Sequence, residues 1–292
     1  HGDGDWIYDT SGKRYLDALC GIAVTGLGHN HPRITKAIQE QASTLIHCSN
    51  LYQIPEQEAL ATKLCLLSNM ETVFFSNSGA EANEAAIKLA RLFGHNKGIE
   101  APVIIVAEQS FHGRTMATLS ATGNRKVQAG FEPLLSGFAR VPYGDVEAVN
   151  QVALNNRNVV AIFIEPVQGE GGIQIPDPQY LNKLKIITKN QDWLLMVDEV
   201  QTGMGRTGAW FAHQHNDIFP DVMTLAKGLG NGVPIGACLA RGKAAEILSP
   251  GTHGSTFGGN PLVSRAALAT IDAIESDSLT DRATFIGNAI TE

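Results

Sequence analysis

One lysine in a glycine-rich segment is the first residue of this sequence that could do unusual chemistry. Lys227 lies in TLAKGLGNGVPIG (224–236), after an apolar run and before several glycines. Lysine normally lies on the wet surface, and glycine-rich backbone loses much entropy when it becomes ordered. A lysine that follows a buried strand is instead desolvated, which lowers the pKa of its amine and frees it to attack carbonyls. Lys227 is therefore a candidate Schiff-base lysine.

A carboxylate ends another apolar run. Asp198 closes the strand-like part of WLLMVDEVQTGMGRTG (193–208), and Glu199, Val200 and Gln201 follow it. A carboxylate buried at a strand end is costly unless it has a cationic partner. That partner is either a neighbouring arginine or the protonated ring nitrogen of a cofactor.

A third segment has the pattern of an anion site. In FFSNSGAEANEAAIKLA, Ser78 and Glu81 form the spacing of a capping box at the start of an alanine-rich helix. Gly79 and Ala80 leave the first helical amides uncrowded, which suits a phosphate. A well-capped helix with no ligand is the alternative reading.

Together these groups match the needs of pyridoxal 5′-phosphate (PLP). A phosphate site, an Asp for the pyridinium nitrogen and a Schiff-base lysine are what this cofactor requires. The Asp keeps the ring nitrogen protonated, so that the ring can accept electrons when a Cα–H bond breaks. Phe111, in EQSFHGRT, is suited to stack on the ring.

The elements that would position these residues alternate between strands and helices. Nearly continuous apolar runs predict strands buried on both faces at 72–76, 103–107, 159–164, 193–198, 222–226 and 235–240. Helices are predicted at 79–93, 145–154 and 178–190. This alternation predicts an α/β fold with a mostly parallel central sheet flanked by helices, with ligands at the carboxyl ends of the strands. The segment GDWIYDTSGKRYLDALCG predicts a separate small hairpin with its turn at DTSGK.

Composition narrows the function classes. The 292 residues are 43% hydrophobic with a net charge of −7, which gives no support for nucleic-acid or anionic-membrane binding. Four scattered cysteines predict reduced thiols in a reducing compartment. The pairs His29-x-His31 and His213-x-His215 lack a clustered third ligand, so we expect no metal site.

A rival pattern lies beside Asp198. Gly203-x-Gly205-x-x-Gly208 fits a dinucleotide fingerprint and would indicate a nucleotide-dependent oxidoreductase. Such a fingerprint belongs in the tight turn between a strand and its helix, whereas polar residues separate these glycines from the strand. A non-catalytic protein with a vestigial site is a further alternative.

Six ordered motifs give the chain a resemblance. FFSNSGAEANEAAIKLAR, SFHGRT, IFIEPVQGEGG, LLMVDEVQTGMGRTG, TLAKGLGNGVPIGA and HGSTFGGNP resemble the class III aminotransferases of fold type I, from about Gly4 to Ala269. The resemblance implies that Lys227 forms the Schiff base and moves a proton between Cα of the substrate and C4′ of PLP. It assigns the other cofactor contacts to Ser78, Gly79, Ala80, Phe111, Asp198, Glu199, Val200, Gln201 and Thr256.

The resemblance also implies a substrate and a partner. Arg114 would bind a substrate carboxylate, Glu170 would pair with an arginine of a C-terminal domain, and Ser255 and Thr256 would act across a homodimer interface. The motifs favour transfer of the terminal amino group of N2-acetylornithine to 2-oxoglutarate, as in arginine biosynthesis. Ornithine, succinylornithine and 4-aminobutyrate remain alternative donors. SFHGRT disfavours an aminomutase of glutamate 1-semialdehyde.

The same resemblance predicts a domain division and a location. Residues 1–26 would begin a small α+β domain, 27–275 would form the large PLP-binding domain, and 276–292 would start the C-terminal part of the small domain. We expect the rest of that part to be missing from this chain. The predicted location is the cytoplasm, with organelle targeting open because the chain starts without Met.

Overall fold

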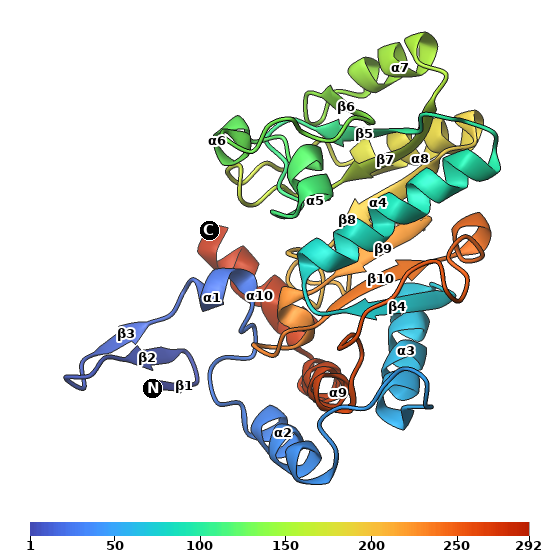
Figure 1. Ribbon diagram of the computed structural model, residues 1–292. Helices are drawn as coiled ribbons and strands as arrows, with labels where there is room; N and C mark the ends of the chain where they lie inside the picture. Colours follow the sequence, from blue (N-terminus) through green and yellow to red (C-terminus); the bar gives the residue numbers. More distant parts are fainter. Residues whose placement is uncertain (292) are drawn as a thin grey trace.

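The central element of the fold is one seven-stranded sheet. The computed structural model describes residues 1–291, and its sheet has the order β4-β10-β9-β8-β7-β5-β6 (Figure 1). The strands are β4 (Thr72–Ser76), β5 (Val103–Ala107), β6 (Phe138–Val141), β7 (Val159–Ile164), β8 (Leu194–Asp198), β9 (Val222–Leu225) and β10 (Gly236–Ala240). Strands β6, β5, β7, β8 and β9 pair in parallel, whereas β10 is antiparallel to both β9 and β4. The predicted α/β fold with a mostly parallel sheet is confirmed.

The predicted strands agree with the structure to within one residue at each end, and β6 was missed. All residues of β7, β8, β9 and β10 are buried, as their continuous apolar runs predict. In contrast, β6 reads Phe-Ala-Arg-Val at the edge of the sheet, and only Val141 of its four residues is fully buried. A strand this short, interrupted by a charged residue, gives no continuous apolar run.

Helices cover both faces of the sheet (Figure 1). Alternate strand residues such as Val106 and Phe163 pack under α4, while Ile105 and Ile162 pack on the opposite side with α8. The helices are α2 (Pro32–Thr44), α3 (Pro55–Ser68), α4 (Gly79–Asn96), α5 (Met116–Ala121), α6 (Arg125–Gln128), α7 (Val146–Asn155), α8 (Tyr180–Gln191), α9 (Pro261–Ser276) and α10 (Leu279–Thr291). Short 3₁₀ helices are η1 (Ala212–Asn216), η2 (Lys227–Leu229) and η3 (Gly242–Ala244). Within the described residues, no helix is both long and apolar enough to cross a membrane.

A small three-stranded sheet precedes this body. It consists of β1 (Gly2–Asp3), β2 (Trp6–Tyr8) and β3 (Arg14–Leu16), with the predicted turn at DTSGK between the last two. The following turn, α1 (Cys20–Ala23), is left-handed at all four residues, Gly21 included. The chain then joins the main body, where the backbone N–H of Leu27 donates to Asn231 Oδ1 at 2.9 Å. The N-terminal segment is thereby tied to the loop that follows Lys227.

Helix α3 offers a matched test of the core beneath β4. Leu64 is 0% exposed in the cluster formed with α9, whereas Leu66, two positions on, is 73% exposed. Leu64→Ala should lower the free energy of unfolding by about 2 to 5 kcal/mol, because it leaves a cavity. Leu66→Ala should change it by no more than about 0.5 kcal/mol. Urea denaturation followed by circular dichroism measures both, and equal effects would contradict this packing.

Candidate active site

Most of the predicted site residues gather around one cavity. It has a volume of about 430 Å³ and lies at the carboxyl ends of β7, β8 and β9. Its walls include these residues expected from the sequence: Ser78, Gly79, Ala80, Phe111, Arg114, Glu170, Asp198, Val200, Gln201 and Lys227. Asn83, His112 and Glu165 also line it, as do Val24 from the N-terminal segment and the stretch 232–235.

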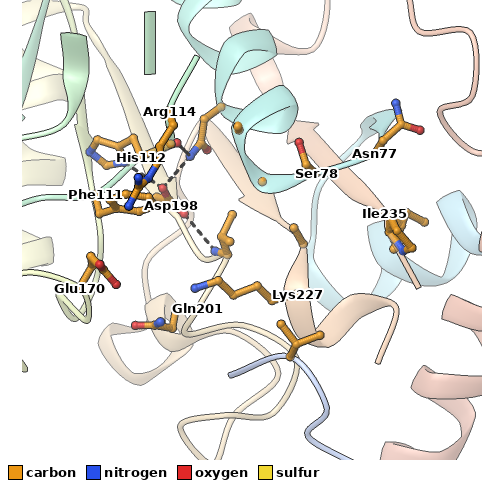
Figure 2. A pocket seen from close by; sticks show the side chains of 18 of the residues that line it. Asn77, Ser78, Phe111, His112, Arg114, Glu170, Asp198, Gln201, Lys227 and Ile235 are labelled. Atoms are coloured by element: carbon orange, nitrogen blue, oxygen red, sulfur yellow. Dashed lines mark hydrogen bonds and ion pairs between the residues drawn. The ribbon is translucent and has the colours of Figure 1, made fainter. Parts of the chain in front are cut away.

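Lys227 extends into this cavity from the start of η2 (Figure 2). Its φ of 42° is in the left-handed region, which is strained for a residue with a side chain. Figure 2 shows the side chain reaching toward the wall that carries Gln201 and Asp198. Burial lowers the pKa of the amine below its ordinary value, although the charges of Asp198 and Glu165 act in the opposite direction. In the structure this lysine is half-buried.

Asp198 is held by hydrogen bonds at the end of β8. It is 4% exposed, and its Oδ1 accepts from the backbone N–H of Val200 at 3.0 Å. Its Oδ2 accepts from Asn83 Nδ2 and from His112 Nδ1, each at 2.8 Å. The His112 ring stacks on Phe163 with centroids 4.3 Å apart. Since a carboxylate offers about four acceptor positions, one remains on Oδ1 once the described residues are counted.

The N-terminus of α4 has the predicted cap in a modified form. Ser78 Oγ accepts from the backbone N–H of Glu81 at 3.2 Å. The Glu81 carboxylate reaches back one residue further than in a standard capping box, to the backbone N–H of Asn77 at 2.6 Å. A side chain at Gly79 would meet Val200 at 2.9 Å, so glycine is required for this close approach. Ser78, Gly79 and Ala80 at this helix start line the cavity, and the first N–H groups of a helix have no partner within the helix.

Glu165 is a second buried carboxyl group of the cavity. It lies directly after β7, and its Oε2 accepts from the backbone N–H of Phe111 at 3.1 Å. Burial raises its pKa to about 7, an effect that His112 opposes and the charge of Asp198 strengthens. In the sequence Glu165 is a carboxylate at the end of an apolar run, a pattern that a purely structural residue shares.

Glu199 does not lie where it was expected. Its carboxylate accepts from Thr202 Oγ1 at 2.6 Å, from the backbone N–H groups of Ala212 and His213, and pairs with His213 Nδ1 at 3.0 Å. It lines none of the cavity. The expected cofactor contact of Glu199 is therefore corrected: successive residues of a strand end face opposite sides, and Glu199 instead ties the strand end to η1.

Ser255 and Thr256 lie outside this cavity. They line a neighbouring hollow of about 350 Å³ together with His253, Glu81 and Glu84. Asn77 borders both spaces, and its Nδ2 donates to Ser255 Oγ at 3.4 Å.

The rival patterns take other structural roles. Gly203, Gly205 and Gly208 lie in turns that no α-helix directly follows, and a side chain at Gly208 would collide with Thr284 of α10. That arrangement is not a dinucleotide fingerprint. His29 pairs with Asp17 at 2.7 Å and His213 with Glu199. Among residues 1–291, no group of three or more His, Cys, Asp or Glu side chains could hold a metal ion.

The arrangement fits PLP. A buried carboxylate with one unused acceptor position suits a pyridinium N–H, and a helix N-terminus with small first residues suits a phosphate dianion. A half-buried lysine with a lowered pKa lies in the same cavity. The residues present therefore fit the three demands of this cofactor.

Comparison with known proteins gives the family. The sequence matches the family described as "Aminotransferase class-III" over residues 1–292. It is 66% identical to the acetylornithine aminotransferase of Nitrosomonas europaea, over all of this chain and 74% of that protein. It is 51% identical to the acetylornithine aminotransferase of Mycobacterium tuberculosis, over 99% of this chain and 71% of that one. The chain belongs to the class III aminotransferase family and is an aminotransferase.

Solved structures agree. The ornithine aminotransferase of Toxoplasma gondii superposes with a TM-score of 0.96 at 35% identity, covering 99% of this chain and 69% of that one. The acetylornithine aminotransferase of Elizabethkingia anophelis superposes with a TM-score of 0.87 at 36% identity, covering 99% and 70%. Another structure of the Toxoplasma enzyme, with a TM-score of 0.95, has PLP partly occupying its active site.

Glu165 makes the stability of the PLP-free protein depend on pH. Its pKa is raised in the folded state, so between its ordinary value and about 7 the folded protein binds more protons than the unfolded chain. The free energy of unfolding therefore falls as pH rises through this window. Glu165→Gln, which can still accept the Phe111 N–H, should remove that loss and gain on the order of 1 to 3 kcal/mol over the wild type by pH 8.

Urea midpoints at pH 5, 6, 7 and 8 measure this effect. Glu100→Gln, at an exposed position, is the matched control and should follow the wild-type curve. A Glu165→Gln curve parallel to that of the wild type would show that Glu165 is ionised throughout.

Proposed function

We propose that this chain binds PLP and transfers the terminal amino group of N2-acetylornithine to 2-oxoglutarate. The products would be N-acetylglutamate semialdehyde and glutamate, in arginine biosynthesis. The observation that carries the choice of donor is the 66% identity to an acetylornithine aminotransferase over the whole chain. Lys227, Asp198 and the start of α4, which line one cavity, support the cofactor.

Each end of the cofactor has its own protein partner in this proposal. Ser78, Gly79 and Ala80 would hold the phosphate at the N-terminus of α4, where the helix dipole and free amides favour an anion. Asp198 would face the ring nitrogen with its remaining acceptor position. Phe111 would stack on a face of the ring, Val200 would also contact the cofactor, and Gln201 would contact the ring hydroxyl.

The chemistry divides between cofactor and protein. When bound, PLP supplies a carbonyl that amines attack and a ring that takes up the electrons of a breaking C–H bond. Lys227 Nζ would hold the cofactor covalently and then move a proton at the substrate carbon that bears the amino group. The lowered pKa of this amine supports the role, because the neutral form is the one that attacks a carbonyl or accepts a proton.

Two charged residues of the cavity would take part in substrate binding, Arg114 directly and Glu170 through an arginine. Arg114 is exposed at the wall, with its guanidinium 6.0 Å from the Phe111 ring centroid, and its planar fork suits a carboxylate. Glu170 would pair with an arginine of the C-terminal domain and release it when glutamate binds.

We also propose that the small domain and the large PLP-binding domain divide after residue 26 and again after residue 275. We further propose a cytoplasmic location, which the four free cysteines support.

We further propose a homodimer with shared active sites. Thr256 would bind the phosphate, and Ser255 the substrate, in the partner's site. The support is that both residues line a hollow next to the cavity rather than the cavity itself. Exposed apolar side chains such as Leu51, Tyr52 and Phe257 supply surface that a second copy would bury.

A panel of amino donors tests the reaction. The protein loaded with PLP is mixed in turn with N2-acetylornithine, succinylornithine, ornithine and 4-aminobutyrate, and the visible absorbance of the cofactor is followed as it takes up the amino group. N2-acetylornithine should react with a kcat/KM at least about 10-fold above the others, because apolar lining residues such as Val24 and Val233 disfavour a charged substituent at the α-nitrogen of the donor. Lys227→Ala should lose both the yellow absorbance and the response. No response to N2-acetylornithine, with a fast response to another donor, would refute the proposed substrate.

Mixed dimers test the shared site. Lys227→Ala and Thr256→Ala chains, each poorly active alone, are unfolded together and refolded as a mixture. Half of the dimers should then pair one chain of each kind, and each mixed dimer should hold one site with both Lys227 and Thr256. Activity should recover to roughly a quarter of the wild-type value, because a shared site combines residues of two chains. Activity that stays at the level of the separate variants would mean that each chain completes its own site.

A further inference from the structure

A buried amide beneath the cavity uses every hydrogen-bonding group that it has. Asn83 lies in the second turn of α4 and is 2% exposed. Its Nδ2 donates to Asp198 Oδ2 at 2.8 Å and to the backbone carbonyl of His112 at 2.7 Å. Its Oδ1 accepts from Thr224 Oγ1 at 2.6 Å. Both N–H groups and the carbonyl are therefore satisfied, which fixes the orientation of the amide as well as its position.

These hydrogen bonds connect the elements that carry the cavity's functional groups. Helix α4 begins with the residues that line the cavity at the proposed phosphate position. Asp198 ends β8, and Thr224 lies in β9, three residues before Lys227. His112 lies between Phe111 and Gly113, in the segment that leads to Arg114. One side chain of α4 thus contacts three other segments that it meets only in the folded protein.

The contact with Asp198 decides which part of the carboxylate stays free. Asn83 and His112 together occupy both acceptor positions of Oδ2, and Val200 occupies one position of Oδ1. Without the Asn83 donor, Oδ2 would regain a free position and the carboxylate could rotate. A leucine at 83 would also leave the His112 carbonyl and the Thr224 hydroxyl without this partner in a buried place.

We propose that Asn83 is a positioning residue of the cofactor site. Its amide holds Asp198 so that the one remaining acceptor position on Oδ1 serves the ring nitrogen of PLP. Through Thr224 it also holds β9, the strand before Lys227, against α4. Through the His112 carbonyl it holds the segment that carries Phe111 against the same helix, whose N-terminus is the proposed phosphate site. This inference rests on the proposed use of PLP, and it adds a residue that touches the reacting atoms only through others.

The test compares PLP affinity and steady-state kinetics of variants in the full-length, PLP-loaded protein. Asn83→Leu replaces the amide with an apolar group of the same branching, and Asn83→Asp keeps the shape but replaces the amide donor beside Asp198 with a second carboxyl group. Either should raise the Kd of PLP on the order of 10- to 100-fold, the range seen when outer partners of bound groups are removed. The visible absorbance maximum should shift, and kcat should fall more than the KM of the amino donor rises, because Arg114 is untouched.

Thr224→Val provides a second variant in case both Asn83 variants fail to fold. It removes only the hydroxyl that holds the Asn83 carbonyl, and it should raise the Kd of PLP by about 3- to 10-fold. Thr270→Val is the matched control. Thr270 is also 0% exposed, and its hydroxyl donates to Ala266 within α9, away from the cavity. This control should leave the Kd, the spectrum and kcat unchanged.

The outcomes separate the two proposals. Wild-type protein that does not bind PLP would refute the proposed function itself. A wild type that binds PLP, with folded Asn83 variants of unchanged affinity, spectrum and kcat, would overturn the role of Asn83. If the Asn83 variants do not fold, equal PLP affinities of Thr224→Val and Thr270→Val would overturn it in the same way.

Discussion

The buried carboxylate of Asp198 is the constraint on which the arrangement of the cavity depends. An unpaired carboxylate at 4% exposure would cost several kcal/mol, so the fold must bring donors to it. The donors come from three places: the turn after β8, helix α4 and the segment after β5. Parallel strands make this possible because their carboxyl ends meet at one edge of the sheet. The hydrogen bonds that satisfy this one side chain therefore hold these three segments together at the cavity.

The charge of Asp198 affects the pKa values of two other titratable groups in the cavity, Lys227 and Glu165. Desolvation lowers the pKa of Lys227, while the negative charges near it limit how far that pKa falls. The same negative charge of Asp198 contributes to the raised pKa of Glu165, which holds a proton near neutral pH. The cavity therefore contains one carboxyl group with a raised pKa and one amine with a lowered pKa. Such a set of displaced pKa values in a single cavity is characteristic of sites that move protons.

The sequence predicted the parts of this site that depend on local pattern. Lys227, Asp198 and the Ser78 cap each follow or precede a strong apolar or alanine-rich run, and all three lie on the cavity. The edge strand β6 and the direction of β10 were not predictable from runs of apolar residues alone. The role of Asn83 was not predictable either, because its partners are up to 141 positions away in the chain and no local sequence pattern indicates them. Glu199 was expected to contact the cofactor because it is adjacent to Asp198 in sequence. Asp198 lines the cavity, but Glu199 does not.

The choice of amino donor must be made by side chains rather than by the fold. An ornithine aminotransferase superposes on this chain with a TM-score of 0.96, yet ornithine and N2-acetylornithine differ at the α-nitrogen, which is a cation in one and a neutral amide in the other. That nitrogen lies at the opposite end of the donor from the amino group that reacts, and therefore away from Lys227. Val24 and Val233, which line the cavity from outside the strand ends, are apolar, and Glu170 would already be paired with the proposed arginine, so an isolated ammonium would find no counter-charge. Desolvating an unpaired cation costs far more than desolvating an amide, so walls of this kind favour the acylated donor. In the proposed function, Lys227 and Asp198 would account for the transfer of an amino group, and apolar lining residues such as Val24 and Val233 would bear on which molecule supplies it.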